Sequence, residues 1–173
     1  MAGVCFVICK KSEIEKTANY PSRSFYLNLY QQYKYSEEHG EMQFTPPVQV
    51  IYALRQALKE FFEEGQKGRF ERYKDNFAVL KRGLKDLGFK SLLKEECQSH
   101  ILTTIIEPKH PNYDFTLMHD ILYEKGFTIY PGKIGETKSF RVANMGAIDN
   151  GDIDAFFVAC KEALSNMQIK TPL

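Results

Sequence analysis

The stretch GFTIYPGK at residues 126–133, followed by FRVANMG at 140–146, decides how this chain folds. Apolar, aromatic and β-branched residues in it predict two short strands, Phe127–Tyr130 and Ser139–Ala143. Pro131-Gly132 is a dipeptide typical of turns, so we expect the chain to reverse there. Two strands joined this way predict an antiparallel arrangement.

Arg141 lies inside the second of these strands. Side chains alternate between the two faces of a strand, so Phe140 and Val142 are expected on one face and Arg141 on the other. Arginine is seldom buried without an anionic partner. The face that carries Arg141 is therefore expected to open onto a polar cleft, and a structural salt bridge is the alternative.

The segments on either side of this stretch extend the sheet and cover it. His100–Ile106 is rich in β-branched residues and predicts a third strand. Asp114 is a suitable cap for a helix that Gly126 ends, and Asp149 begins a last amphipathic helix. Their apolar positions are Leu117, Met118, Ile121, Leu122, Ile153, Phe156, Phe157, Cys160 and Leu164.

Two more helices precede the sheet. Thr45 can cap a helix whose first turn contains Pro46 and Pro47, and this helix is expected to end near Gly65. A second helix is expected over Arg69–Leu87, with Gly88 as its stop signal. The predicted fold class is therefore α+β, a small, mostly antiparallel sheet with helices on one face.

The amino-terminal region has a different character. Gly3–Cys9 is an apolar run that predicts a strand covered on both faces, as in parallel α/β sheets. Ser12 is expected to cap a short helix over Glu13–Lys16. Asn19–Gln43 has many aromatic residues without a clear period and predicts an extended connection that includes one helical turn. A chain that opens directly in its most apolar segment is expected to be part of a longer one.

Composition narrows the function classes. A formal net charge of +1 over 173 residues gives no global field for nucleic acid or an acidic membrane. No stretch approaches the roughly 20 apolar residues of a membrane span. Cys5, Cys9, Cys97 and Cys160 form no metal-ligand spacing and predict free buried thiols in a reducing, cytoplasmic setting, with a disulfide or metal site as the alternative. The four histidines are scattered, so no metal site is expected.

Five segments together resemble a known family. They are GVCFVICK at 3–10, FTPPVQVIYAL at 44–54, QSHILTT at 98–104, GFTIYPGK at 126–133 and FRVANMG at 140–146. In this order and spacing they resemble the class V branch of the fold-type-I aminotransferases, which use pyridoxal 5'-phosphate (PLP). The similarity is greatest to the members that act on 2-aminoethylphosphonate and pyruvate, and it covers essentially the whole chain.

The resemblance implies a division and two site residues. Residues 1–42 would be a remnant of the large PLP-binding domain and 43–173 the carboxy-terminal small domain of a homodimeric enzyme. Thr45 matches the threonine that reaches the PLP phosphate of the partner subunit, with a simple helix cap as the alternative. Arg141 matches the arginine that binds the anionic group of the substrate. The lysine that forms the Schiff base with PLP is expected before Met1, so the chain alone is expected to be inactive.

Three functions stay open. The first is transfer of the amino group of 2-aminoethylphosphonate to pyruvate by the full-length protein. The second is another class V reaction, of the alanine–glyoxylate or serine–pyruvate type, because that substrate pocket also uses an arginine. The third is a non-catalytic binding module of α+β type.

Overall fold

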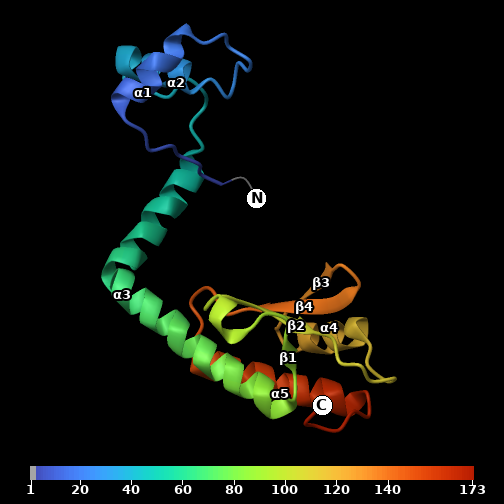
Figure 1. Ribbon diagram of the computed structural model, residues 1–173. Coiled ribbons are helices and arrows are strands. Elements are labelled where there is room, and N and C mark those ends of the chain that lie inside the picture. The colour runs from blue at the N-terminus through green and yellow to red at the C-terminus, as the bar shows by residue number, and fades with distance from the viewer. Residues whose placement is uncertain (1–2) are drawn as a thin grey trace. The chain divides into compact units, whose positions relative to one another are not determined.

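The computed structural model describes residues 3–173, and these form two compact units, which divide between Glu63 and Glu64 (Figure 1). The expected division at residues 42 and 43 refers to the domains of a full-length enzyme and stays a prediction. The first unit contains helix α1 (Lys11–Lys16), the short 3-10 helix η1 (Thr17–Asn19), helix α2 (Leu29–His39) and the start of α3.

Helix α3 (Val48–Leu87) is broken at Gly65, whose φ of 75° and ψ of 157° are not helical. Gly65 therefore ends the first helix, and a second one follows, as expected. Gly88 closes this second helix with a φ of 83°. The amide of Gly88 donates to the carbonyl of Lys85 and that of Phe89 to the carbonyl of Leu84, the paired bonds that satisfy the last turn of a helix.

The amino-terminal predictions were partly wrong. Gly3–Cys9 forms no strand, and its side chains are largely exposed, with Ile8 at 89%. A strand needs neighbouring strands to bond its backbone groups, and no described residue supplies them. The first helix begins at Lys11, so Ser12 lies within it and is not its cap.

Helix α2 was missed because none of its residues is buried, so its sequence has no apolar period. Both ends of α2 nevertheless have capping residues typical of a helix. The Asn28 side chain accepts from the amide of Gln31, and Gly40 closes the helix in the left-handed conformation. The expected extended connection over Asn19–Gln43 is therefore corrected to one with an 11-residue helix.

The second unit is built on a four-stranded antiparallel sheet in the order β1-β2-β4-β3. This confirms the predicted α+β class. The strands are β1 (Lys90–Ser91), β2 (Leu102–Ile106), β3 (Tyr130–Ile134) and β4 (Thr137–Ala143), and a 3-10 turn, η2 (Glu95–Cys97), lies between β1 and β2. The two-residue edge strand β1 was not predicted.

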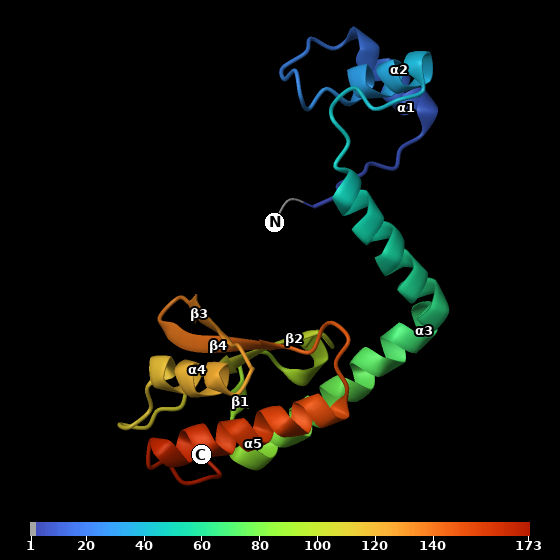
Figure 2. The same ribbon diagram turned by 180° about the vertical axis from the view of Figure 1, so that it is seen from behind.

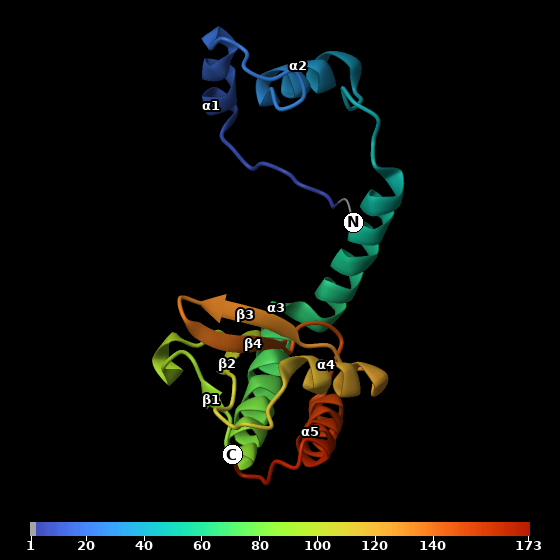
Figure 3. The ribbon, with the colours of Figure 1, turned by 90° about the vertical axis from the view of Figure 1, so that its right-hand side faces the viewer.

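Three helices pack against one face of this sheet, and Figure 3 shows them on the same side of it. They are the second part of α3, α4 (Phe115–Glu124) and α5 (Asn150–Asn166), and α5 runs alongside α3 (Figure 2). Asp114 and Asp149 cap α4 and α5 as predicted. The core between sheet and helices is made largely of Leu80, Leu84, Leu87, Ile105, Met118, Leu122, Phe140, Val142, Phe156, Phe157 and Leu164.

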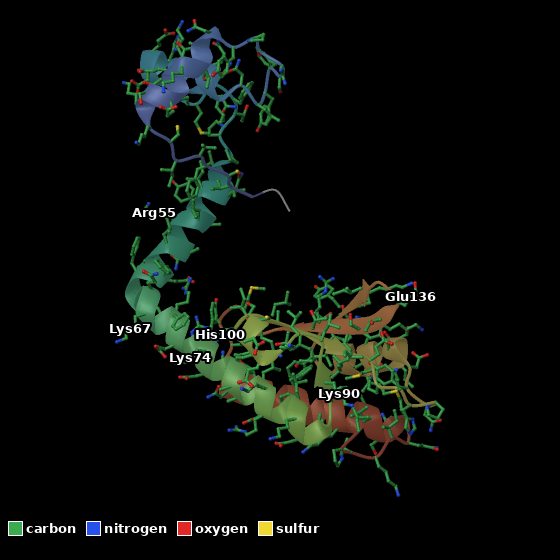
Figure 4. All side chains as sticks on the ribbon, viewed as in Figure 1. Arg55, Lys67, Lys74, Lys90, His100 and Glu136 are labelled. Atoms are coloured by element: carbon green, nitrogen blue, oxygen red, sulfur yellow. The ribbon has the colours of Figure 1, made fainter. Side chains whose placement is uncertain are left out.

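The chain reversal between the two strands of residues 126–146 lies later than predicted. Pro131 and Gly132 are part of strand β3, and the reversal occurs at Gly135-Glu136, where Figure 4 labels Glu136. Gly135 has a φ of 59°, a conformation that glycine adopts without a steric penalty. Proline is tolerated in β3 because this strand lies at the edge of the sheet, where a missing amide donor leaves no partner unbonded.

The prediction of free thiols is confirmed for all four cysteines, and the prediction of burial is confirmed for one. Cys160 is buried in α5, at 1% exposure, whereas Cys5, Cys9 and Cys97 are exposed. All four are free. No helix in residues 3–173 combines the length and apolar character that crossing a membrane requires.

Candidate functional site

Arg141 lies in the middle of β4 and is exposed, while Phe140 and Val142 on either side of it are buried in the core. The alternation predicted from the sequence is therefore present. Arg141 pairs with Thr104 of β2 and with Tyr130 of β3, and cross-strand partners share a face. We call the face that carries these residues and Ser139 the open face, because none of α3, α4 and α5 packs against it.

Within the described residues, the guanidinium of Arg141 makes a single hydrogen bond. Its Nη2 donates to the carbonyl of Pro131 at 3.3 Å, which is a long hydrogen bond. No carboxylate among the described residues lies within 4.0 Å of it, so the alternative of a salt bridge inside its own unit is not found there. Arg141 therefore has both the exposure and the unused donors to bind an anion.

Arg72 provides the contrast. Its Nε donates to Oε1 of Glu64 at 2.6 Å, and its Nη1 donates to the carbonyl of Gly146. The hydrogen bonds from Arg72 and Arg69 lower the pKa of Glu64 from its ordinary 4.5 to about 2. Arg72 is thus a structural arginine, satisfied by its own unit, and Arg141 is not.

The antiparallel pairing of β2 with β4 brings two of the sequence motifs together. The segment before β2 contains Gln98 and His100, and the segment after β4 begins at Asn144. The buried Asn144 side chain donates to the carbonyls of His100 and Tyr73, at 2.9 and 3.2 Å. Asn144 therefore fixes the end of the strand that carries Arg141.

The ring of His100 lies between two aromatic residues of α3. The ring centroids of Phe70 and Phe77 are 5.9 and 5.3 Å from it, and Figure 4 shows His100 beside this helix. None of the ion pairs within residues 3–173 includes His100. Among residues 3–173, no group of three or more His, Cys, Asp or Glu is arranged to hold a metal.

Thr45 belongs to the first unit and is exposed. Helix α3 begins at Val48, and the carbonyl of Pro47 accepts from the amide of Ile51, so Pro47 occupies the cap position. The alternative of Thr45 as a simple helix cap is therefore wrong. Its hydroxyl has no partner among the described residues, and it lies next to a helix start whose first-turn amides lack intrahelical acceptors. These groups fit a contact with a phosphate.

Two further residues on the open face were not singled out from the sequence. Gly132 of β3 and Ser139 of β4 are cross-strand partners. Ser139 has no exposed surface, and its hydroxyl has no partner among the described residues. Alternation in the predicted strand Ser139–Ala143 already places Ser139 on the face of Arg141. Gly132 joins this face through the register of the β3–β4 hairpin, whose turn was predicted at the wrong residues.

The fold agrees with the comparisons. The chain is homologous to class V aminotransferases and corresponds to the carboxy-terminal part of their sequences. Members of this family use PLP. No protein-family model matches the chain.

The chain is 37% identical over 170 residues to the 2-aminoethylphosphonate–pyruvate transaminase of Rhizobium meliloti (strain 1021). The aligned region covers 98% of this chain and 44% of the relative. It is 39% identical over 164 residues to the transaminase of the same name from Syntrophobacter fumaroxidans. The aligned region covers 94% of this chain and 44% of that relative. The chain thus spans less than half the length of the curated relatives it matches.

Solved structures share the fold at lower identity. Ureidoglycine–glyoxylate aminotransferase from Bacillus subtilis matches with a TM-score of 0.77 and 22% identity over 92% of this chain and 42% of that one. Pyridoxamine–pyruvate aminotransferase from Mesorhizobium loti matches with a TM-score of 0.78 and 18% identity over 93% and 42%.

Proposed function

We propose that these residues are the carboxy-terminal part of a PLP-dependent aminotransferase that moves the amino group of 2-aminoethylphosphonate to pyruvate. The products would be phosphonoacetaldehyde and alanine. The observation that carries the proposal is an exposed arginine without an acidic partner among the described residues, in a chain 37% identical to a relative of that name. The full-length enzyme is proposed to be a cytoplasmic homodimer.

Arg141 is proposed to bind the anionic group of the substrate. A planar guanidinium can hold two oxygens of a phosphonate or a carboxylate through parallel hydrogen bonds, which an ammonium group cannot reproduce. Because this contact fixes the charged end of the substrate, it also directs the amino group at the other end. Arg141 therefore orients the substrate for the reaction as well as attracting it.

Thr45 is proposed to contact the phosphate of PLP that is bound in the partner subunit. Its free hydroxyl and the first-turn amides of Gln49 and Val50 are donors suited to a phosphate. When bound, PLP supplies the electron sink of the transamination, and the lysine that holds it is proposed to precede these residues in the full-length enzyme. Lys10, Lys11 and Lys133 do not match its position.

The test is made in the full-length enzyme with Arg141→Ala and Arg141→Lys. Removal of a desolvated charge contact costs about 2–5 kcal/mol, so kcat/KM for 2-aminoethylphosphonate is expected to fall by roughly two to three orders of magnitude. The absorbance of bound PLP should not change. Lys138→Ala is the matched control, because Lys138 lies on the same strand but not on the open face.

The amine donor separates this proposal from its alternative. Arg141 alone cannot, since alanine–glyoxylate and serine–pyruvate aminotransferases are expected to use an arginine for a carboxylate. Alanine, serine and 2-aminoethylphosphonate are therefore offered with pyruvate or glyoxylate as acceptor. A clear preference for alanine or serine would favour another class V reaction.

A further inference from the structure

The side chains of Ser139 and Arg141 explain why residue 132 is a glycine. Its backbone is not in the left-handed region, so its conformation does not require glycine. A Cβ built on Gly132 would lie 2.9 Å from Oγ of Ser139 and 3.8 Å from Nε of Arg141. The missing side chain therefore leaves a space that borders both polar groups.

The hydroxyl of Ser139 borders the position where a Cβ of residue 132 would lie. The residue is fully buried, and its Oγ has no hydrogen-bond partner among the described residues. A buried hydroxyl without a partner destabilises a fold, because it has lost its bonds to water and gained none. A serine at this position is explained if its Oγ acquires a partner in another state of the protein.

Arg141 is the group that can supply this partner. Its side chain runs from β4 toward β3, since Nη2 reaches the carbonyl of Pro131 and Nε lies near Gly132. The bond to Pro131 is long and therefore readily exchanged. A small rearrangement of the guanidinium would bring Nε–H toward Oγ of Ser139 through the space that Gly132 leaves.

We propose that Gly132 and Ser139 are positioning residues for Arg141, an inference that rests on the proposed function. When the anionic group of the substrate binds, Nε–H of Arg141 donates to Oγ of Ser139. Both terminal nitrogens then point to the anion and hold it through two parallel hydrogen bonds. Gly132 contributes by having no side chain in the path of the guanidinium.

The first test replaces Ser139 with alanine in the full-length enzyme and measures two properties. The melting temperature is expected to rise, because an unpaired buried hydroxyl is removed. The KM for 2-aminoethylphosphonate is expected to rise about tenfold, with little change in kcat, since a hydrogen bond to a charged group is lost. A purely structural serine would give the first change without the second.

Thr103→Val is the matched control. Thr103 also has a buried hydroxyl without a partner, but it pairs with Val142 and therefore lies on the core face of the sheet. Its replacement is expected to raise the melting temperature and to leave KM unchanged. If Ser139→Ala also leaves KM unchanged, the positioning role is overturned.

The second test is Gly132→Ala, whose methyl group would fill the space beside Arg141. The KM is expected to rise by about the same tenfold factor as in Ser139→Ala, with the PLP absorbance unchanged. Gly68→Ala in α3, where the added Cβ meets only Cγ of Glu64 at 3.4 Å, is the control for a glycine replacement. A wild-type KM in Gly132→Ala overturns its part in the proposal.

These outcomes are separate from failure of the proposed function. If Arg141→Ala is inactive while both Ser139→Ala and Gly132→Ala keep a wild-type KM, the function stands and the positioning role falls. If the enzyme uses another amine donor, the proposed substrate falls, and the same variants are measured with that donor. Absence of transamination with every donor overturns both.

Discussion

The ring of Phe157 on α5 packs against Gly83 of α3 so closely that a Cβ at Gly83 would overlap three atoms of the ring. Phe157 is itself buried in the core, at 7% exposure, so a shift of its ring would disturb the packing around it. The two helices can therefore lie side by side only because residue 83 has no side chain (Figure 2).

Gly83→Ala is expected to lower the free energy of unfolding by about 1–3 kcal/mol, the usual cost of overpacking a core. Gly68→Ala, in the same helix but with space for the methyl group, is expected to raise it by about 0.8–1 kcal/mol through helix propensity alone. Denaturant unfolding of both variants checks the opposite signs. Equal effects would contradict the close packing.

The pair of Glu64 with Arg72 predicts an acid-sensitive contribution to stability. Since the pKa of Glu64 is lowered to about 2 in the folded chain, its contribution is complete above about pH 4.5 and is lost as the pH falls toward 2. Glu64→Gln is expected to remove this part of the pH dependence of unfolding. Carboxyl titration by NMR checks the cause, and a Glu64 midpoint near 4.5 in the unchanged chain would contradict it.

Arg72→Gln is the companion variant. The hydrogen bond from Arg72 is the largest cause of the shift, so its loss should move the pKa of Glu64 back toward the ordinary value. Arg69 remains as a second donor, at 2.8 Å. The return is therefore expected to be partial, and an unchanged midpoint would show that Arg72 is not the cause.

The four thiols are expected to react in two classes. Burial raises the pKa of Cys160, so neither access nor the thiolate form favours its reaction. Cys5, Cys9 and Cys97 are exposed and should react quickly with a disulfide reagent at neutral pH. Cys160 should react only when the chain unfolds. Four fast thiols would show that the core around α5 opens readily.

The 173-residue chain is expected to form no stable lysine adduct with PLP. Borohydride reduction followed by mass analysis is the measurement, and weak labelling of several lysines is the expected result. The reason is the proposed position of the Schiff-base lysine, which would precede these residues in the full-length enzyme. Stoichiometric labelling of one lysine would contradict this prediction. An unrelated protein of similar lysine content is the control.

The sequence predicted those parts of the fold that depend on local signals. Asp114 and Asp149 each cap a helix, and Gly65 and Gly88 each end one, because a cap or a left-handed glycine acts within a few residues. The exposure of Arg141 followed from strand alternation. The α+β class followed from the order of these elements.

The failures concern features that depend on distant partners. Gly3–Cys9 has the composition of a strand, but composition does not supply the neighbour that a strand must pair with. Pro131-Gly132 resembles a turn, yet its place at a sheet edge allows it to continue as a strand. The misplaced turn hid the pairing of Gly132 with Ser139, so the place of Gly132 on this face could not be predicted. Strand alternation alone could have placed Ser139 on the face of Arg141.

The strand order of the sheet has a consequence for synthesis of the protein. Strand β2 borders β1 and β4, and β4 is the last strand to be made, after α4 and β3. The centre of the sheet therefore cannot pair until the ribosome has passed residue 143. Even then, Leu80 and Leu84 of α3 lack the cover that α5 provides. The nascent second unit must therefore expose apolar surface until its final helix emerges, and exposed apolar surface of this kind promotes aggregation during translation.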